Sequence, residues 1–380
     1  MKGAIPLGRV LGIRIGIHST FFLIIAWMAW LGWQYAGWSA SLWAIGMIVL
    51  LFSCVILHEL GHSVVALQFG VEVTSITLLP IGGVAAMRSI PDTPWQELLI
   101  AVAGPAVNIV ILLIMVPLLG FPDLIEAPLI PQSIRELMDW LIRANLALVV
   151  FNMVPAFPMD GGRVLRALLA MCFSYTTATA WATGAGRVVA VLFVVLGMRW
   201  NPFLALIGVF IFLGAGGEYR NVQIKEALRP YTVADLMRRN FGRVRGIDAV
   251  RSCLEAYHQD GHEHFIVEGV DGSLRGLLPA SVWMAVLKER GPDEWIGRHM
   301  IQRYMSVSPN MALHESIWEL SALNQEVFPV FVDRDIVGLL VMKDLRAIAL
   351  PQQSQPPPAE QQFETERRFR LRAKRWVDMG

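Results

Sequence analysis

Long apolar stretches fill the first 217 residues and restrict the folds open to this chain. The first four are long enough for the ~20 residues that cross a bilayer, whereas the last two are shorter. Hydrocarbon offers the backbone no hydrogen-bond partners, so such segments are expected to span as helices. This part is therefore predicted to be an α-helical polytopic membrane domain of about six transmembrane helices. They cover about 19–38, 42–69, 95–119, 137–158, 187–198 and 202–216.

Composition changes after about Gly217. The whole chain is 55% hydrophobic and 17% charged, with a mean hydropathy of +0.50, but charged residues become frequent only in the second half. We predict a membrane domain at 1–217, a linker at 218–230 and a soluble α/β domain at 231–350. The net charge of +1 argues against a nucleic-acid partner.

The placement of charges predicts the orientation in the membrane. The loops expected on one side contain Asp123 and Glu126 and, of basic residues, only Arg135 and Arg199. Basic residues concentrate on the cytosolic side of membrane proteins. We therefore expect a multi-pass protein of the inner or plasma membrane, with both termini and the soluble domain in the cytosol. The basic residues expected on the cytosolic side are Lys2, Arg9, Arg14, Arg163, Arg166, Arg187, Arg220, Lys225 and Arg229.

The sequence HELGH at 58–62 places ionisable residues inside the second apolar stretch. His58 and His62 are four residues apart, so on a helix they share one face, roughly 6 Å apart along the axis. Two imidazoles in this arrangement can bind one zinc ion, and Glu59 can act beside them as a general base. Ionisable residues at bilayer depth are costly. This cost favours a zinc site toward the cytosolic face over two histidines that only hydrogen-bond within a bundle.

A third zinc ligand is expected, because a catalytic zinc usually has three protein ligands and one open position. The candidate is Asp160 in FNMVPAFPMDGGRVL at 151–165. Two prolines interrupt the helix there, and the alternation of spans brings Asp160 to the depth of HELGH. Alone, Asp160 fits a Pro/Gly interfacial turn equally well. Together with HELGH, it is predicted to bind zinc.

The two motifs together resemble the site-2 protease family of intramembrane zinc metalloproteases (M50-type). HExxH lies in one membrane helix and N-x-x-P-x-x-P-x-D-G follows a later one. Three further segments support the resemblance: IRIGIHSTFF at 13–22, PIGGVAAM at 80–87 and AGPAVN at 103–108.

The resemblance implies an enzyme, a metalloendopeptidase with one Zn²⁺ per chain. His58, His62 and Asp160 are the implied ligands, and Glu59 is the implied general base acting on a zinc-activated water. Asn152 is expected to orient the substrate or an oxyanion; the alternative is a hydrogen bond that packs helices. Enzymes of this family cleave membrane-anchored proteins in or near their transmembrane segment. The implied partner in the lipid bilayer is a membrane-tethered regulator, such as an anti-sigma factor or a transcription regulator.

Residues 71–87 (VEVTSITLLPIGGVAAM) alternate β-branched residues and break at Pro80 and Gly82. This pattern predicts a re-entrant β-hairpin, and a simple interfacial loop is the alternative. The edge of such a hairpin can pair with an unwound substrate strand.

The second half contains an internal repeat. Gly276–Leu277–Leu278 and Gly338–Leu339–Leu340 lie 62 residues apart, each after a β-like run, HFIVEG or FPVFVD. The repeat resembles a tandem pair of cystathionine-β-synthase (CBS) domains, at about 231–290 and 297–350.

CBS domains pair with one another and often bind adenine nucleotides in the cleft between them. Asp344 matches the aspartate that holds the ribose in that family, but Pro279, Val282 and Val341 depart from its pattern. The resemblance therefore leaves two roles open, an adenine-nucleotide site or a module that is purely structural or forms a homodimer. If the CBS pair regulates transport instead, the chain is a membrane metal or ion transporter, which is the alternative function.

Two further segments look functional at first sight. His258, His262 and His264 lie close in sequence, but no carboxylate or cysteine pattern supports a metal site, and we expect solvated side chains. Residues 351–380 begin PQQSQPPP and end FRLRAKRWVDMG. They predict a flexible Pro/Gln-rich linker and a basic tail, which either contacts an anionic leaflet or stays in solvent.

Overall fold

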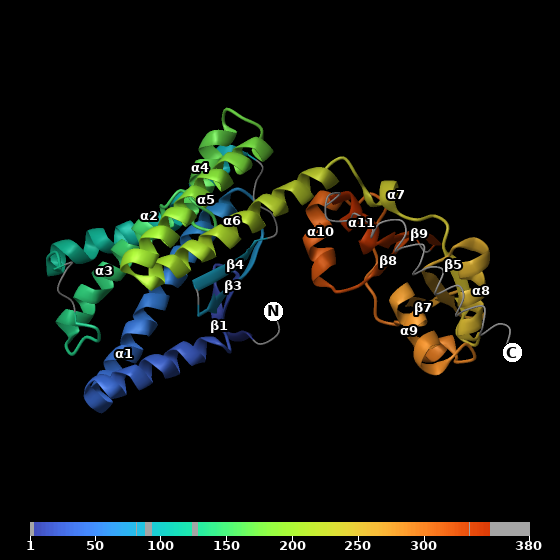
Figure 1. The fold of residues 1–380 in the computed structure, drawn as a ribbon, viewed down its shortest axis with the longest axis horizontal. Coiled ribbons are helices and arrows are strands. Elements are labelled where there is room, and N and C mark those ends of the chain that lie inside the picture. The colour runs from blue at the N-terminus through green and yellow to red at the C-terminus, as the bar shows by residue number, and fades with distance from the viewer. Residues whose placement is uncertain (1–3, 81, 88–92, 124–127, 334, 350–380) are drawn as a thin grey trace. The chain divides into compact units, whose positions relative to one another are not determined.

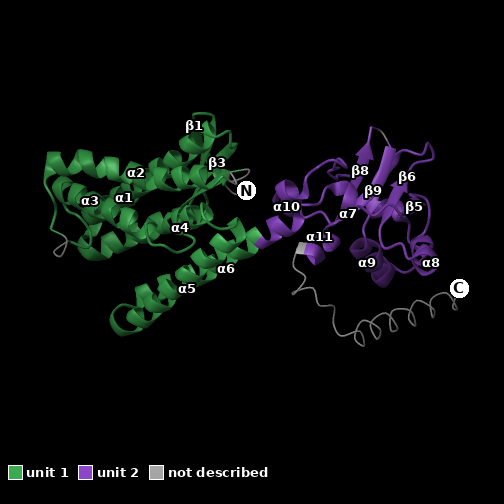
Figure 2. Cartoon of the chain, turned by 90° about the horizontal axis from the view of Figure 1, so that it is seen from above, with its two compact units in different colours: residues 1–222 green, residues 223–380 purple. Residues whose placement is uncertain are grey.

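The computed structural model describes residues 4–80, 82–87, 93–123, 128–333 and 335–349. The chain divides into two compact units at residues 1–222 and 223–380 (Figure 2). The predicted linker and basic tail at 351–380 lie outside the described residues.

The helix α1 (Phe21–Gln68) contains two of the predicted membrane helices in one element (Figure 1). Its helical geometry breaks near Gly37, whose φ of 75° suits glycine. The two arms then fold back on one another. Phe21 of the first arm packs edge-on against Phe52 of the second, with ring centroids 4.5 Å apart. HELGH lies near the end of the second arm.

Four of the described helices, α1, α2, α5 and α6, are long and apolar enough to cross a membrane. The prediction of a multi-pass helical membrane domain is confirmed, but the predicted number of six spans is not. α3 contains four charged residues in its first ten, and α5 begins 12 residues before the helix expected at 187–198. α6 continues through most of the segment expected as a linker. The helices after α1 are α2 (Pro94–Leu119), α3 (Ile134–Asn152), α4 (Asp160–Ala170), α5 (Tyr175–Trp200) and α6 (Pro202–Leu228).

A four-stranded sheet packs beside these helices, in the order β1-β2-β3-β4. The β3–β4 hairpin forms in the predicted segment, and its insertion into the bilayer stays a prediction. β1 and β2 were not predicted; β2 pairs with β3 in parallel, and Ile13 and Ile76 join a core with Ala66 of α1 and Ile100 of α2. β4 is an edge strand. The bounds are β1 (Ala4–Val10), β2 (Ile13–His18), β3 (Val73–Leu79) and β4 (Gly82–Met87).

The second unit begins with the end of α6, from Gln223, and with α7 (Val233–Leu236), and then repeats one arrangement of strands and helices. Gly276 and Gly338 occupy the same place in the two copies, and each copy has its own apolar core. The predicted internal repeat is therefore present in the structure. The first copy contains β5 (Gly242–Arg245), α8 (Val250–Asp260), β6 (Phe265–Glu268), β7 (Leu274–Leu278) and α9 (Ala280–Arg290). After the short helix η1 (Ile296–Arg298), the second contains α10 (Leu313–Ala322), β8 (Val327–Val332), β9 (Asp335–Val341) and α11 (Met342–Ala349).

Candidate active site

The structure brings His58, His62 and Asp160 together. The Nε2 atoms of the two histidines lie 3.1 Å apart, and they lie 3.1 and 3.2 Å from Oδ2 of Asp160. The exposed fractions of the three residues are 6%, 4% and 8%. The described residues contain one group of this kind with the spacing of a metal site.

Glycines allow the elements around these three residues to approach closely. A Cβ at Gly161 would lie 2.3 Å from the carbonyl oxygen of Val154, so the loop after α3 can fold against the start of α4 only without a side chain there. A Cβ at Gly104 would lie 2.2 Å from Nε2 of His62. The glycine in α2 therefore leaves room for the imidazoles.

The hydrogen bonds made by Nδ1 of each histidine determine what its Nε2, which faces Asp160, can bind. Nδ1 of His58 lies 2.6 Å from Oδ1 of Asn108, and Nδ1 of His62 lies 2.6 Å from the carbonyl oxygen of Ile100. Both oxygens only accept, so in the neutral histidines each Nδ1 carries the proton and each Nε2 presents a lone pair. These two lone pairs face each other and the carboxylate of Asp160, with no donor between them.

A cation resolves this convergence of three acceptors. Two imidazole nitrogens and one carboxylate oxygen form a common ligand set for catalytic zinc. Tetrahedral bonds of about 2.0–2.1 Å would separate the ligand atoms by about 3.3 Å, close to the distances in the structure. The residues therefore fit a zinc ion.

Glu59 follows His58 on α1 and is half-buried. Its side chain lies against β4. A Cβ added to Gly83 of this strand would lie only 2.6 Å from Cγ and 3.3 Å from Oε1 of Glu59. The candidate base therefore lies between the three ligand residues and an edge strand.

Asn152 is the last residue of α3 and is half-buried. Its side chain makes no hydrogen bond that the described part of the chain reveals, so both predicted roles stay open.

A second buried cluster was not predicted from the sequence. Arg166, in α4, is fully buried. Its guanidinium donates at 2.8 Å to Oε1 of Glu97 in α2 and at 2.8 Å to Oε1 of Glu218 in α6. Arg166 was expected among the cytosolic loop charges; it is instead an internal ion-pair partner, so it does not report orientation. Glu97, a carboxylate within an apolar stretch, was the one feature of the sequence that could have predicted a buried ion pair.

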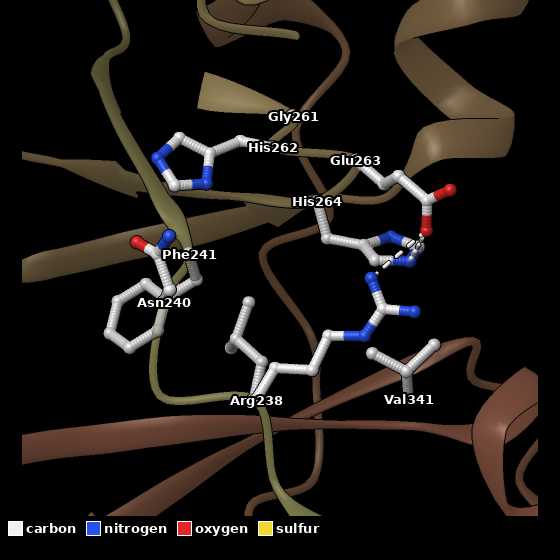
Figure 3. Close-up of a pocket in the computed structure, with 9 residues that line it drawn as sticks. Arg238, Asn240, Phe241, Gly261, His262, Glu263, His264 and Val341 are labelled. Carbon is white, nitrogen blue, oxygen red and sulfur yellow. Dashed lines mark hydrogen bonds and ion pairs between the residues drawn. The ribbon is translucent and has the colours of Figure 1, made fainter.

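The second unit contains a polar pocket near Arg238 (Figure 3). Arg238 donates to both carboxylate oxygens of Asp344, at 2.6 and 2.8 Å, and to Glu263 at 3.0 Å. These hydrogen bonds raise the pKa of Arg238. The carboxylate predicted to hold a ribose is thus already paired. The pocket is lined by Arg238, Asn240, Phe241, Gly261, His262, Glu263, His264, Leu339 and Val341.

The expectation that all three nearby histidines are solvated is wrong for His264. It is 5% exposed, and its Nδ1 accepts a hydrogen bond from the backbone N–H of Ala280 at 3.1 Å. Burial lowers its pKa. A backbone donor, rather than a metal, therefore occupies this ring nitrogen.

Comparisons with known proteins identify the family. The family model of peptidase family M50 matches residues 46–124 and 120–196. The zinc metalloprotease MJ0392 of Methanocaldococcus jannaschii is 37% identical over 241 residues, which are 63% of this chain and 68% of that protein. This chain belongs to peptidase family M50. The Synechocystis protein sll0528 is 30% identical over 367 residues, covering 90% of this M50 peptidase and 94% of its own length.

Solved structures also match. A site-2 protease from Methanocaldococcus jannaschii is 37% identical, covers 57% of this chain and 95% of its own, and gives a TM-score of 0.43. CBS-domain structures cover 30–33% of this chain at 14–20% identity, with TM-scores of 0.26–0.29. The family membership confirms the predicted class of enzyme, a multi-pass membrane zinc metalloendopeptidase.

Proposed function

We propose that this M50 peptidase hydrolyses peptide bonds in or near the transmembrane segment of membrane-anchored regulatory proteins. The observation that carries the proposal is the buried group of His58, His62 and Asp160 beside the edge strand β4, in a unit of membrane-crossing helices. A site in this setting favours substrates that arrive through the bilayer. A membrane-tethered anti-sigma factor or transcription regulator is the proposed kind of substrate.

Each residue of the site has a proposed role in the hydrolysis. His58, His62 and Asp160 hold the zinc ion, which when bound polarises the scissile carbonyl and makes a coordinated water acidic. Glu59 takes a proton from the attacking water and returns it to the leaving amine. Asn152, with no partner among the described residues, is free to orient the scissile carbonyl.

The substrate must leave its helix before hydrolysis, because helical hydrogen bonds shield its peptide groups. β4 pairs only with β3 among the described strands, so its outer backbone groups can pair with an extended substrate. Gly83 lets this strand pass against Glu59. An unwound segment on β4 would therefore lie beside the base.

We propose that the second unit is a cytosolic CBS pair with a structural role rather than a nucleotide sensor. The two-fold repeat of its elements supports a CBS pair. The ion pair between Arg238 and Asp344 favours the structural role, since a ribose would have to displace the guanidinium. Calorimetric titration of the full-length protein with ATP and AMP tests this: we expect no heat of binding for the natural protein, and binding with millimolar affinity or better would restore the sensing role.

Replacing Glu59 tests the enzymatic proposal. Glu59→Gln should reduce cleavage of a transmembrane reporter in liposomes by about 10²–10⁴-fold, while the protein keeps one zinc ion per chain. Glu289→Gln, on the exposed end of α9, makes the same chemical change far from the site and serves as the control. Full cleavage by Glu59→Gln would overturn the mechanism, and ion flux unaffected by the change would favour the transporter alternative.

A further inference from the structure

The Nδ1 atoms of the two histidines have different hydrogen-bond partners. Nδ1 of His62 faces a backbone carbonyl, that of Ile100. Nδ1 of His58 faces a side chain, the amide of Asn108. A carbonyl oxygen of the backbone accepts in any orientation, but an amide side chain can present either its oxygen or its NH₂ group. The support of His58 therefore depends on which way Asn108 points.

A second asparagine determines the orientation of Asn108. Nδ2 of Asn108 donates to Oδ1 of Asn145, in α3, at 2.8 Å. Nδ2 of Asn145 in turn donates to the carbonyl oxygen of Leu141 at 2.9 Å. This last oxygen can only accept, so the NH₂ group of Asn145 must point toward it. Each amide is then oriented by the one behind it, from the α3 backbone to His58.

Burial makes the opposite orientation costly. Asn108 and Asn145 are both fully buried, and water cannot satisfy a group that loses its partner there. If Asn108 were flipped, its NH₂ group would face Nδ1 of His58 and its oxygen would face Oδ1 of Asn145. The reversed amide would favour the other histidine tautomer, in which Nε2 carries the proton and cannot bind zinc.

We infer that Asn108 and Asn145 are positioning residues for the metal site. The two amides hold His58 as the Nδ1–H tautomer, so that its Nε2 lone pair points at the zinc position. The inference rests on the proposed zinc role of His58, His62 and Asp160, but not on the identity of the substrate. Groups that support a metal-ligating histidine in this way typically contribute 10–100-fold to metal affinity.

Zinc affinity distinguishes this role from simple helix packing. We would measure the zinc dissociation constant of the full-length protein in detergent, by competition with a chromophoric chelator, and the melting temperature of the metal-free protein. Asn108→Leu should weaken zinc binding about 10–100-fold. Asn108→Asp should weaken zinc binding less than Asn108→Leu, because one carboxylate oxygen still accepts from Nδ1–H although the other faces Oδ1 of Asn145. Asn145→Leu should also weaken binding less than Asn108→Leu, since Asn108 keeps its oxygen but is then free to rotate.

Thr179→Val is the matched control. Thr179 is also fully buried, and it donates to the carbonyl oxygen of Tyr175 within α5 at 2.7 Å. Its loss should lower the melting temperature but leave the zinc dissociation constant within about twofold, as expected for a hydrogen bond away from a metal.

Three outcomes would overturn the inference. One is zinc binding by Asn108→Leu as tight as in the natural protein. Another is equal weakening by Asn108→Leu and Asn108→Asp, and the third is a loss in Asn145→Leu no larger than in Thr179→Val. Cleavage is measured separately: if the natural protein binds zinc with this pattern but cuts no membrane reporter, the proposed function fails and the positioning role stands.

Discussion

Two buried clusters of ionisable residues in the first unit differ in whether they contain a hydrogen-bond donor for their acceptors. In one, the guanidinium of Arg166 donates to the carboxylates of Glu97 and Glu218. In the other, two imidazole lone pairs and the carboxylate of Asp160 converge with no donor between them. The first cluster contains its own cation, Arg166, whereas the second is complete only with an added one. Burial of charge alone therefore does not identify a metal site; the count of donors and acceptors does.

One face of α2 contacts both clusters. Glu97 binds Arg166, Ile100 and Asn108 support the two histidines, and Gly104 leaves room for their rings. These four positions are spaced by three or four residues, which places them along one side of a helix. The same helix therefore supports a structural ion pair and a metal site.

Removing the anionic ligand of the metal site should have the largest effect on zinc binding and cleavage. Asp160→Ala leaves only two neutral ligands, so we expect the protein to lose its zinc on dialysis and to show no cleavage above background. Metal analysis and the reporter assay measure both. Asp335→Asn, exposed in β9, should change neither, and zinc retained by Asp160→Ala would mean that the ligand set is misassigned.

Breaking the ion-paired cluster of Arg166 and Glu97 should instead cost stability. Arg166→Met leaves Glu97 buried without its cation, which typically costs about 3–5 kcal/mol in the free energy of unfolding. Unfolding in mixed micelles measures the loss, and the folded fraction should still bind zinc. Arg220→Met, an exposed change in α6, should stay within about 0.5 kcal/mol. A stability loss for Arg166→Met as small as that of the control would mean that the ion pair is not buried as described.

Removing both charges should be milder than removing one. In Arg166→Met combined with Glu97→Leu, the one charge left is that of Glu218, whose side chain is 26% exposed and keeps contact with water. We therefore expect recovery of at least about 2 kcal/mol relative to Arg166→Met. The same unfolding measurement serves, with Glu97→Leu alone to complete the cycle. A double variant less stable than Arg166→Met would show that shape, not charge balance, holds these helices together.

The smallest effect is expected in the second unit, where the comparable cluster reaches solvent. The side chains of Arg238 and Asp344 are 36% and 30% exposed, so water screens their attraction. Arg238→Met should cost about 1 kcal/mol or less in the free energy of unfolding of this unit, measured by hydrogen exchange of its strands. A cost near that of Arg166→Met would contradict the dependence on burial.

Short-range patterns made part of the molecule predictable. HELGH brings its three functional residues together within little more than one helical turn, and the 62-residue repeat is visible in the sequence. Asp160 could be predicted as a ligand because it lies in a Pro/Gly turn that is expected at the same membrane depth as the two histidines.

Features that depend on packing between distant segments were not predictable. The two partners of Arg166 lie 69 and 52 residues away in sequence, so the sequence placed its charge in a cytosolic loop. The parallel pairing of β2 with β3 joins strands separated by the whole of α1, and no local pattern encodes it. The support of His58 by Asn108 and Asn145 likewise requires three helices in place.

The outer edge of β4, which pairs with no other strand in the described part of the chain, also bears on selectivity. Backbone N–H and C=O groups are the same in every peptide, so pairing with this strand would recognise an extended conformation rather than a particular sequence. Discrimination among membrane proteins would then depend on how readily a segment leaves its helix, and glycine, proline and β-branched residues make that easier. An enzyme built in this way would choose its substrates by the weakness of their helices.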